Sequence, residues 1–433
     1  MYDQLSTLPV ELIHKILDYV PTFDILTSVW LINKRLRTVS LAYPRFRLEL
    51  TCSFDKKKIF YQLCTQLVNI SSQVVSLALY DLEDETIPDK ISYFFGRSNT
   101  FNSTFSHLQS LHLSHVNYNV WDSIKTQLVS LVALTATSTN YGIYEEPQTP
   151  SFASIILMDL FNFSPSLKRL SLATIDYPYP IATIDPSRTL TASSLEYVDL
   201  SCIEIDLKSL FSITPALHSF TSTVDYNILI SNIHEHPSVN LQRLSITFDG
   251  VTFKIIECLL SSMNCLAHFT LVAEKEYPMV SLQRLQHLKL AFSYSNEDEL
   301  NIVNRFSSFV SLTSLHVDLN GTGLQTDLQE RFNRDSFLST LPFTATIVCT
   351  HHENTLLDAN WWTRMFASNK KLQRISLQLN WPTNDYESDL DIDILQNFRS
   401  STYFTQLKVN VTDCEDGEFP NFYYRFSIYL LSR

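Results

Sequence analysis

Basic and imidazole side chains recur at fixed places in a short repeated phrase of the sequence, and their chemistry suits an anionic partner. The phrase is LxxLxL, in which each L is an apolar residue and each x varies. Successive strand side chains alternate between two faces, so the variable positions face away from the apolar ones. Arg, Lys and His can donate charge-assisted hydrogen bonds there to an acidic or phosphorylated segment, and the alternative is a mixed face that only meets solvent. The candidate substrate-binding residues are Arg169, Tyr197, Arg243, His268, His287, Lys289, His316 and Arg374.

Residue types used in catalysis are present, but the spacings that catalysis and metal binding need are not. Only 6 of the 433 residues are glycine, and the sequence contains no GxGxxG or Walker A phosphate-binding loop. It also contains no GxSxG or HExxH motif. His351, His352 and Glu353 are consecutive, so their side chains would point apart on a strand or a helix. We therefore predict no catalytic residue, no metal and no cofactor, and we expect the chain not to be an enzyme.

Charge and hydropathy exclude further classes of function. The chain has 32 Lys and Arg against 45 Asp and Glu, a net charge of −13, which opposes binding to nucleic acid or to anionic lipid. No uncharged apolar run approaches the ~18 residues of a membrane span, and the first residues do not resemble a signal peptide. The 7 cysteines are scattered without a CxxC pair, as expected for reduced thiols. We expect a cytoplasmic or nuclear protein with no nucleic-acid or membrane partner.

The elements that could position a partner begin with short N-terminal helices. Apolar residues between positions 12 and 20 return every three or four residues, which is typical of one helical face. Pro9 suits the first turn of this helix and Pro21 ends it. A second apolar run starts at Thr22, and Asn33 is placed to cap a third helix. So short a bundle buries too little surface to be stable alone, and it should need a partner surface.

This segment resembles an F-box motif. The resemblance covers roughly residues 5–45 and rests on Leu8-Pro9-x-Glu11-Leu12 at its start and Asn33-Lys34-Arg35-Leu36-Arg37 at its end. In that family the motif is a three-helix module that binds the Skp adaptor of a cullin-RING ubiquitin ligase. The resemblance implies an adaptor-binding set that consists of Leu8, Pro9, Glu11, Leu12, Ile16, Leu17, Val20, Asp24, Ile25 and Leu26.

The remaining sequence is repetitive. From residue 74 onward the LxxLxL phrase recurs about a dozen times, and its first positions from Leu167 to Leu312 lie 28, 22, 24, 25, 19 and 27 residues apart. This spacing matches the ~20 to 29 residues of a leucine-rich repeat. Helix-like segments, such as 253–263, 300–309 and 360–367, lie between phrases, and residues 344–350 are strand-like. The pattern predicts an α/β solenoid with parallel strands on a concave face and helices on a convex face, and it resembles the divergent leucine-rich repeats that often follow an F-box.

Together these features predict three regions: an F-box module at 1–48, a linker or capping segment at 49–73, and an irregular leucine-rich-repeat solenoid at 74–433. The resemblance implies a non-catalytic substrate receptor of a Skp-cullin-F-box ubiquitin ligase. The F-box would hold the Skp adaptor, and through it a cullin and a RING subunit, while the repeats hold a protein substrate. The alternative is a leucine-rich-repeat interaction scaffold with no ligase role, in which the N-terminal helices only cap the first repeat. Exposure of Leu12, Ile16 and Ile25 would favour docking over capping.

Overall fold

The computed structural model divides the chain into two compact units, Met1–Leu217 (unit 1) and His218–Arg433 (unit 2), and each unit is described by itself. In both units, short parallel strands follow one another along the chain, which makes the protein mixed α/β. The residues that the structure describes are 5, 7–51, 70–80, 91, 94–95, 105–138, 152–174, 181–182, 184, 193–223, 240–248, 260, 263–273, 284–292, 311–318, 344–350, 374–381, 404–414 and 421–430.

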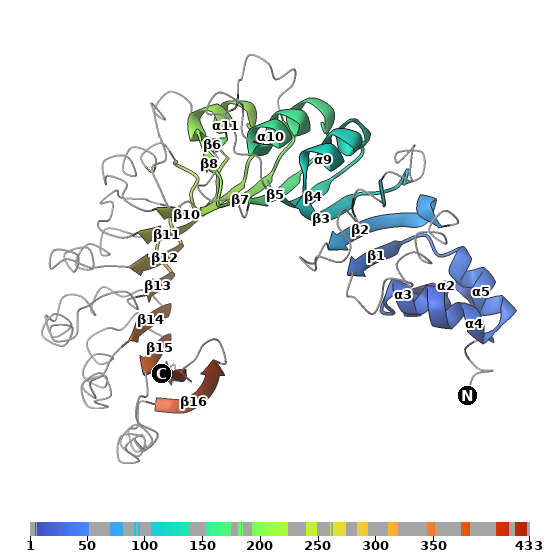
Figure 1. Ribbon diagram of the computed structural model, residues 1–433. Coiled ribbons are helices and arrows are strands. Elements are labelled where there is room, and N and C mark those ends of the chain that lie inside the picture. Colours follow the sequence, from blue (N-terminus) through green and yellow to red (C-terminus); the bar gives the residue numbers. More distant parts are fainter. Residues whose placement is uncertain are drawn as a thin grey trace, which may run out of the picture. The chain divides into compact units, whose positions relative to one another are not determined.

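Unit 1 begins with short helices, at the place that the sequence pattern predicts (Figure 1). The cap prediction for the last helix is confirmed, because the Leu36 amide donates to Asn33 Oδ1 at 2.8 Å. The first helix ends at Leu17, earlier than the apolar pattern indicated, in a turn that precedes Pro21. The second helix is interrupted by a π-helical segment. The elements are α2 (Val10–Leu17), α3 (Thr22–Asp24), the π-helical segment (Ile25–Val29), α4 (Trp30–Ile32) and α5 (Lys34–Leu41).

These helices pack against the first strand of unit 1, β1 (Phe46–Thr51). Tyr43 lies between them: its ring makes edge contacts with His14 and with Phe46, at centroid distances of 5.6 and 5.2 Å. Its hydroxyl donates to the carboxylate of Asp18 at 2.5 Å. The amide of Arg47 in β1 also donates to a threonine hydroxyl of α3 at 3.1 Å. The helices and β1 therefore share one core, and the segment 49–73, predicted as a linker or cap, starts as part of that strand.

The sheet of unit 1 is parallel throughout its described strands, which follow chain order and leave the sheet open. In Figure 1 the helices α9, α10 and α11 lie on one side of strands β3 to β7. The strands are β1, β2 (Val74–Tyr80), β3 (Ser110–Val116), β4 (Ala133–Ser138), β5 (Arg169–Thr174) and β7 (Tyr197–Ser201), and a separate short pair is β6 (Ile181–Ala182) with β8 (Glu204–Ile205). The helices are α9 (Tyr118–Ile124), α10 (Phe152–Phe163) and α11 (Leu207–Ile213), with 3-10 turns at Ser71–Gln73 and Lys125–Gln127.

Backbone geometry repeats from one LxxLxL phrase to the next. The apolar positions of the phrase are buried, as Leu108, Leu111 and Leu113 illustrate. Just before several of the described strands, one carbonyl oxygen accepts two successive amides from the following phrase. In unit 1 the Gln109 oxygen accepts from Val132 and the next amide, both at 2.9 Å. In unit 2 the carbonyl oxygen of Gln242 accepts from two amides of the next phrase in the same way, again at 2.9 Å.

Two phrases of unit 1 also end in the same turn. His115 and Cys202 have φ of 63° and 60°, and each is the second residue after the last apolar position of its phrase. A left-handed conformation at a residue other than glycine is uncommon, so its recurrence at an equivalent place marks a shared turn. Val116 and Ile203, which follow, are fully buried. The turn therefore sends the chain from strand toward helix while placing an apolar side chain in the core.

Unit 2 continues the pattern of parallel strands, again in chain order. The strand predicted at residues 344–350 is confirmed. Of the predicted helices 253–263, 300–309 and 360–367, only Leu260 and Met263 belong to the described residues. The parallel strands are β9 (Ser219–Thr223), β10 (Arg243–Phe248), β11 (His268–Ala273), β12 (His287–Phe292), β13 (Ser314–Asp318), β14 (Thr344–Thr350) and β15 (Arg374–Trp381).

The last two strands depart from the predicted series. The final LxxLxL phrase, which starts at Phe404, was expected to form a further parallel strand. It forms β16 (Phe404–Cys414), which is antiparallel to β17 (Asn421–Leu430), and β17 pairs in turn with β15, also antiparallel. Antiparallel strands can be joined by a short connection, whereas a parallel pair needs a long crossover. The chain between the two strands is too short for such a crossover, so a hairpin replaces the repeat.

Candidate protein-binding surfaces

The N-terminal helices expose several large apolar side chains. On α2, Leu12 and Ile16 are 45% and 39% exposed, and they are neighbours on one helical face because they lie four residues apart. Tyr19 follows at 90%, and Leu31 on α4 reaches 83%. Buried apolar side chains of the same segment, such as Ile13 at 1%, hold the helices together. The exposed residues are therefore not needed for the core and are available to a partner.

The structure divides the predicted adaptor-binding residues into two groups. Pro9, Glu11, Leu12, Ile16 and Asp24 are exposed, and Leu8 and Val20 are half-buried. Leu17, Ile25 and Leu26 are buried in the core of the helical segment, with Ile25 at 0% exposure, so we assign these three to folding and remove them from the candidate surface. Of the three residues whose exposure was to favour docking, two are exposed and Ile25 is not.

The sequence analysis did not single out Tyr19 and Leu31 as surface residues. In the sequence, Tyr19 lies three positions after Ile16 and seven after Leu12, which is the spacing of one helical face, although α2 itself ends at Leu17. Leu31 gave no such signal, because its exposure depends on how α4 packs. The exposed apolar set around α2 and α4 consists of Val10, Leu12, Ile16, Tyr19, Leu31 and Ile32.

On the sheet of unit 1, the predicted binding residues Arg169 and Tyr197 contact each other. They are opposite one another in the register of β5 and β7, and the Arg169 guanidinium lies 5.2 Å from the centre of the Tyr197 ring. Two residues further along, the hydroxyl of Ser171 donates to Asp199 at 3.4 Å. Burial raises the pKa of Asp199, and the bond from Ser171 partly opposes this. The sheet thus holds Arg169 in a cation–π contact, which leaves its N–H groups able to bind an anion.

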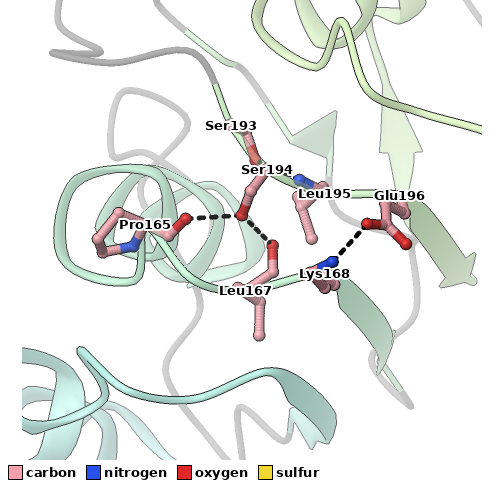
Figure 2. A network of polar contacts seen from close by, with 7 residues as sticks. All are labelled: Pro165, Leu167, Lys168, Ser193, Ser194, Leu195 and Glu196. Carbon is pink, nitrogen blue, oxygen red and sulfur yellow. Dashed lines mark hydrogen bonds and ion pairs between the residues drawn. The ribbon is translucent and has the colours of Figure 1, made fainter.

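A polar network holds the two phrases together just before these strands (Figure 2). The Ser194 hydroxyl donates to the carbonyl oxygens of Pro165 and Leu167, at 2.6 and 2.8 Å. Beside it, Lys168 and Glu196 form an ion pair at 2.8 Å. The hydroxyl satisfies carbonyl groups that the turn leaves unpaired, while the exposed ion pair contributes little to stability. This network joins the two phrases directly before β5 and β7, the strands that carry Arg169 and Tyr197.

Strand register in unit 2 brings five of the predicted residues together. Arg243, His268 and His287 occupy the same position in consecutive strands β10, β11 and β12. Lys289 lies two residues after His287 and is opposite His316 of β13. The apolar residues between them, such as Leu244 and Leu288, are buried, so the predicted alternation is confirmed here. We refer to Arg243, His268, His287, Lys289 and His316 as the unit 2 polar face.

The two central imidazoles of this face are stacked. The rings of His268 and His287 lie parallel, with centroids 4.3 Å apart and planes 1° apart. Burial lowers the pKa of His268 most, and the nearby His287 and Arg243 lower it further. Arg374 aligns with Thr344 in the register of β15 and β14, but its side chain lies outside the described residues.

Two other features of the described residues bear on function, namely clusters of metal-ligating side chains and membrane-spanning helices. Among the described residues, no group of three or more His, Cys, Asp or Glu side chains could hold a metal ion. His351, His352 and Glu353 lie outside the described residues. In the same described part of the chain, no helix is long and apolar enough to cross a membrane.

Comparison with known proteins adds no assignment. A scan against protein-family models finds no match, and a search of curated proteins finds none either.

Proposed function

We propose that the chain is a substrate receptor of a Skp-cullin-F-box ubiquitin ligase. The observation that carries the proposal is the exposed apolar pair Leu12 and Ile16 on α2, directly after the Leu8-Pro9-x-Glu11 sequence that resembles an F-box. An apolar pair of this kind on a helix is a suitable anchor for a partner, because burying it on binding is favourable. The N-terminal helices would hold the Skp adaptor, and the strand faces would hold a protein target.

In this function the chain supplies proximity. A cullin and a RING subunit, recruited through the adaptor, would bring a ubiquitin-charged enzyme to the assembly. Holding the target in the same assembly turns an encounter between free proteins into a reaction within one complex, which raises the effective concentration of target lysines. The residues that matter are then binding residues, and the chemistry takes place on other subunits.

The test is co-elution of the full chain with a purified Skp adaptor, using a matched pair of charge substitutions. Ile16→Asp places a carboxylate in the proposed apolar interface. Val129→Asp introduces the same charge at another exposed apolar residue of unit 1, which is 48% exposed against 39% for Ile16. We expect stoichiometric binding for wild type and Val129→Asp and loss of binding for Ile16→Asp, because a buried unpaired charge is strongly unfavourable. Absence of binding by folded wild type, or equal binding by both variants, would refute the proposal.

A second candidate, an interaction scaffold whose N-terminal helices only cap the first strand, is favoured by one observation. Ile25 is fully buried, and Tyr43 and Phe46 join the helices to β1. A cap of this kind protects the edge of a repeat array. The two functions differ in the co-elution experiment, since only the receptor requires the adaptor to bind.

A further inference from the structure

The unit 2 polar face differs in charge from the rest of the protein. The described strands β9 to β15 contain three basic residues, Arg243, Lys289 and Arg374, against one acidic residue, Asp318. The whole chain has a net charge of −13. On this face Arg243, His287 and Lys289 are exposed, and His268 is half-buried. The face is therefore a local basic surface on an acidic protein.

The spacing of the cations favours charges that are spread along a chain. Neighbouring strands lie about 4.8 Å apart, so Arg243 and His287, two strands apart, are separated by roughly 10 Å. Lys289 lies two residues along its strand from His287, roughly 7 Å further. One compact anion could not contact all of these groups at once. An extended peptide that carries several carboxylates could contact all of them, because each carboxylate could pair with a different cation of the face.

Hydroxyl groups lie between the cations and supply further donors. Thr270 is in register with Lys289 on one side and with Ser245 on the other. Ser314 is opposite His287. Neutral hydroxyls can donate to a carboxylate without adding repulsion between cations. Such donors would also let the face bind several arrangements of acidic residues.

The charge of this face depends on pH through His268, one of the two stacked imidazoles. His268 is faced by Arg243 from β10 and by His287 from β12, while Lys289 lies two residues further along β12, opposite Thr270. Burial disfavours a positive charge on His268 most, and the neighbouring His287 and Arg243 act in the same direction. The acidic residue Asp318 lies further along β13, opposite Ala291. A carboxylate placed against the His268 ring would favour its protonated form instead, because an opposite charge stabilises the imidazolium.

We propose that the unit 2 polar face binds an extended, Asp- and Glu-rich segment of a partner protein. Binding takes up a proton at His268 and is therefore tighter at pH 6 than at pH 8. The inference deepens the receptor function proposed above, because it names the class of target segment, but it concerns residues that the adaptor does not need. Adaptor co-elution and peptide binding are separate measurements, so the failure of one is distinguishable from the failure of the other.

The experiment measures fluorescence anisotropy of a labelled twelve-residue peptide, in which Glu and Asp alternate with Ser and Gly, on the full chain. Carboxylates of the peptide stay ionised between pH 6 and pH 8, so any pH dependence comes from the protein. We expect saturable binding in low salt that is at least fivefold tighter at pH 6 than at pH 8. Weakening at higher salt is expected as well, because the exposed charges are screened.

Variants separate the roles of charge and protonation. Arg243→Glu and Lys289→Glu should each weaken binding at least tenfold at both pH values. Lys34→Glu, the same reversal at an exposed residue of α5, should change it less than twofold. The double variant His268→Gln/His287→Gln should keep binding at pH 8 and reduce the ratio between pH 6 and pH 8 to below twofold.

Several results would overturn the proposal. One is the absence of saturable binding by folded wild type, and another is an Arg243→Glu variant that binds like Lys34→Glu. A peptide with a single phosphoserine and no carboxylate side chains provides a further arm: if it binds more tightly than the acidic peptide, the assignment to carboxylates is wrong. Tighter binding of a single-stranded oligonucleotide would reject a peptide partner.

Discussion

The contact between Tyr43 and Asp18 allows a test of how the N-terminal helices are attached to the sheet. Tyr43 is 5% exposed, and its hydroxyl donates to Asp18 at the end of α2 at 2.5 Å. The same ring packs on Phe46 of β1. Tyr43→Phe removes only the hydroxyl and keeps the packing. Tyr19→Phe is the matched control, because it removes the same atom from a side chain that is 90% exposed.

The expected magnitude follows from the kind of hydrogen bond. A bond to a charged group contributes about 1.5 to 3 kcal/mol. Asp18 is exposed, so its charge is well solvated and the lower end applies. We expect Tyr43→Phe to destabilise the helical segment by about 1.5 kcal/mol, which corresponds to about a tenfold change in an opening equilibrium. Tyr19→Phe should change it by less than about 0.5 kcal/mol.

Hydrogen exchange measured by mass spectrometry is the appropriate assay, because it reports local opening rather than unfolding of the whole chain. Amides of α2 and α5 should exchange about tenfold faster in Tyr43→Phe than in wild type at neutral pH, and those of β10 to β12 should not change. Equal exchange in Tyr43→Phe and Tyr19→Phe would refute the reasoning, since it would mean that the Asp18 bond does not hold the helices.

Titration provides an independent check on the same contact. Burial, and then the hydrogen bond to Asp18, raise the pKa of Tyr43 from 10.0 to about 12. Because the folded pKa lies above the unfolded one, the stabilisation is fully present below pH 10 and is lost as the pH rises through 12. In urea denaturation, the stability difference between wild type and Tyr43→Phe should therefore shrink between pH 10 and pH 12. A constant difference across that window would contradict the assignment.

Three further predictions concern packing, the repeat turn and pH. Ile25→Ala should lower the free energy of unfolding by about 3 kcal/mol in urea denaturation, because Ile25 is fully buried. Leu31→Ala is the control and should be nearly neutral, because Leu31 is 83% exposed. Equal effects of the two substitutions would contradict the assignment of Ile25 to the core. Ser194→Ala should destabilise unit 1 by about 1 kcal/mol, since its hydroxyl binds two carbonyl groups, and an unchanged midpoint would show that water replaces it. Burial lowers the pKa of both His112 and His268, so the unfolded chain binds protons that the folded chain does not, and stability should fall as pH drops from 7 to 5. The double Gln variant of these two histidines should flatten that fall, and an identical pH profile would exclude them as its cause.

Short-range patterns determined much of the fold from the sequence. The LxxLxL phrase specified where strands lie and which of their residues are buried, because strand side chains alternate and the apolar ones must leave water. Asn33 specified the start of α5, because an N-cap needs only the amide three residues ahead. The repeat spacing also placed Arg243, His268 and His287 at the same position of successive phrases, so their alignment was predictable.

Tertiary structure alone decided features that depend on which segments meet. Leu17, Ile25 and Leu26 share the apolar character of Leu12 and Ile16, yet the first three are buried and the other two exposed, because the packing of α5 and β1 selects the inner face. Likewise, the final phrase reads like the others but forms an antiparallel hairpin, since β17 supplies a partner that no local pattern in that phrase encodes. The stacking of His268 on His287 requires a common register and matching ring orientations. The repeat spacing of the sequence predicts the register, but it does not predict the ring orientations. Local spacing fixes the face of a side chain, whereas its partners are set by contacts between residues far apart in the chain.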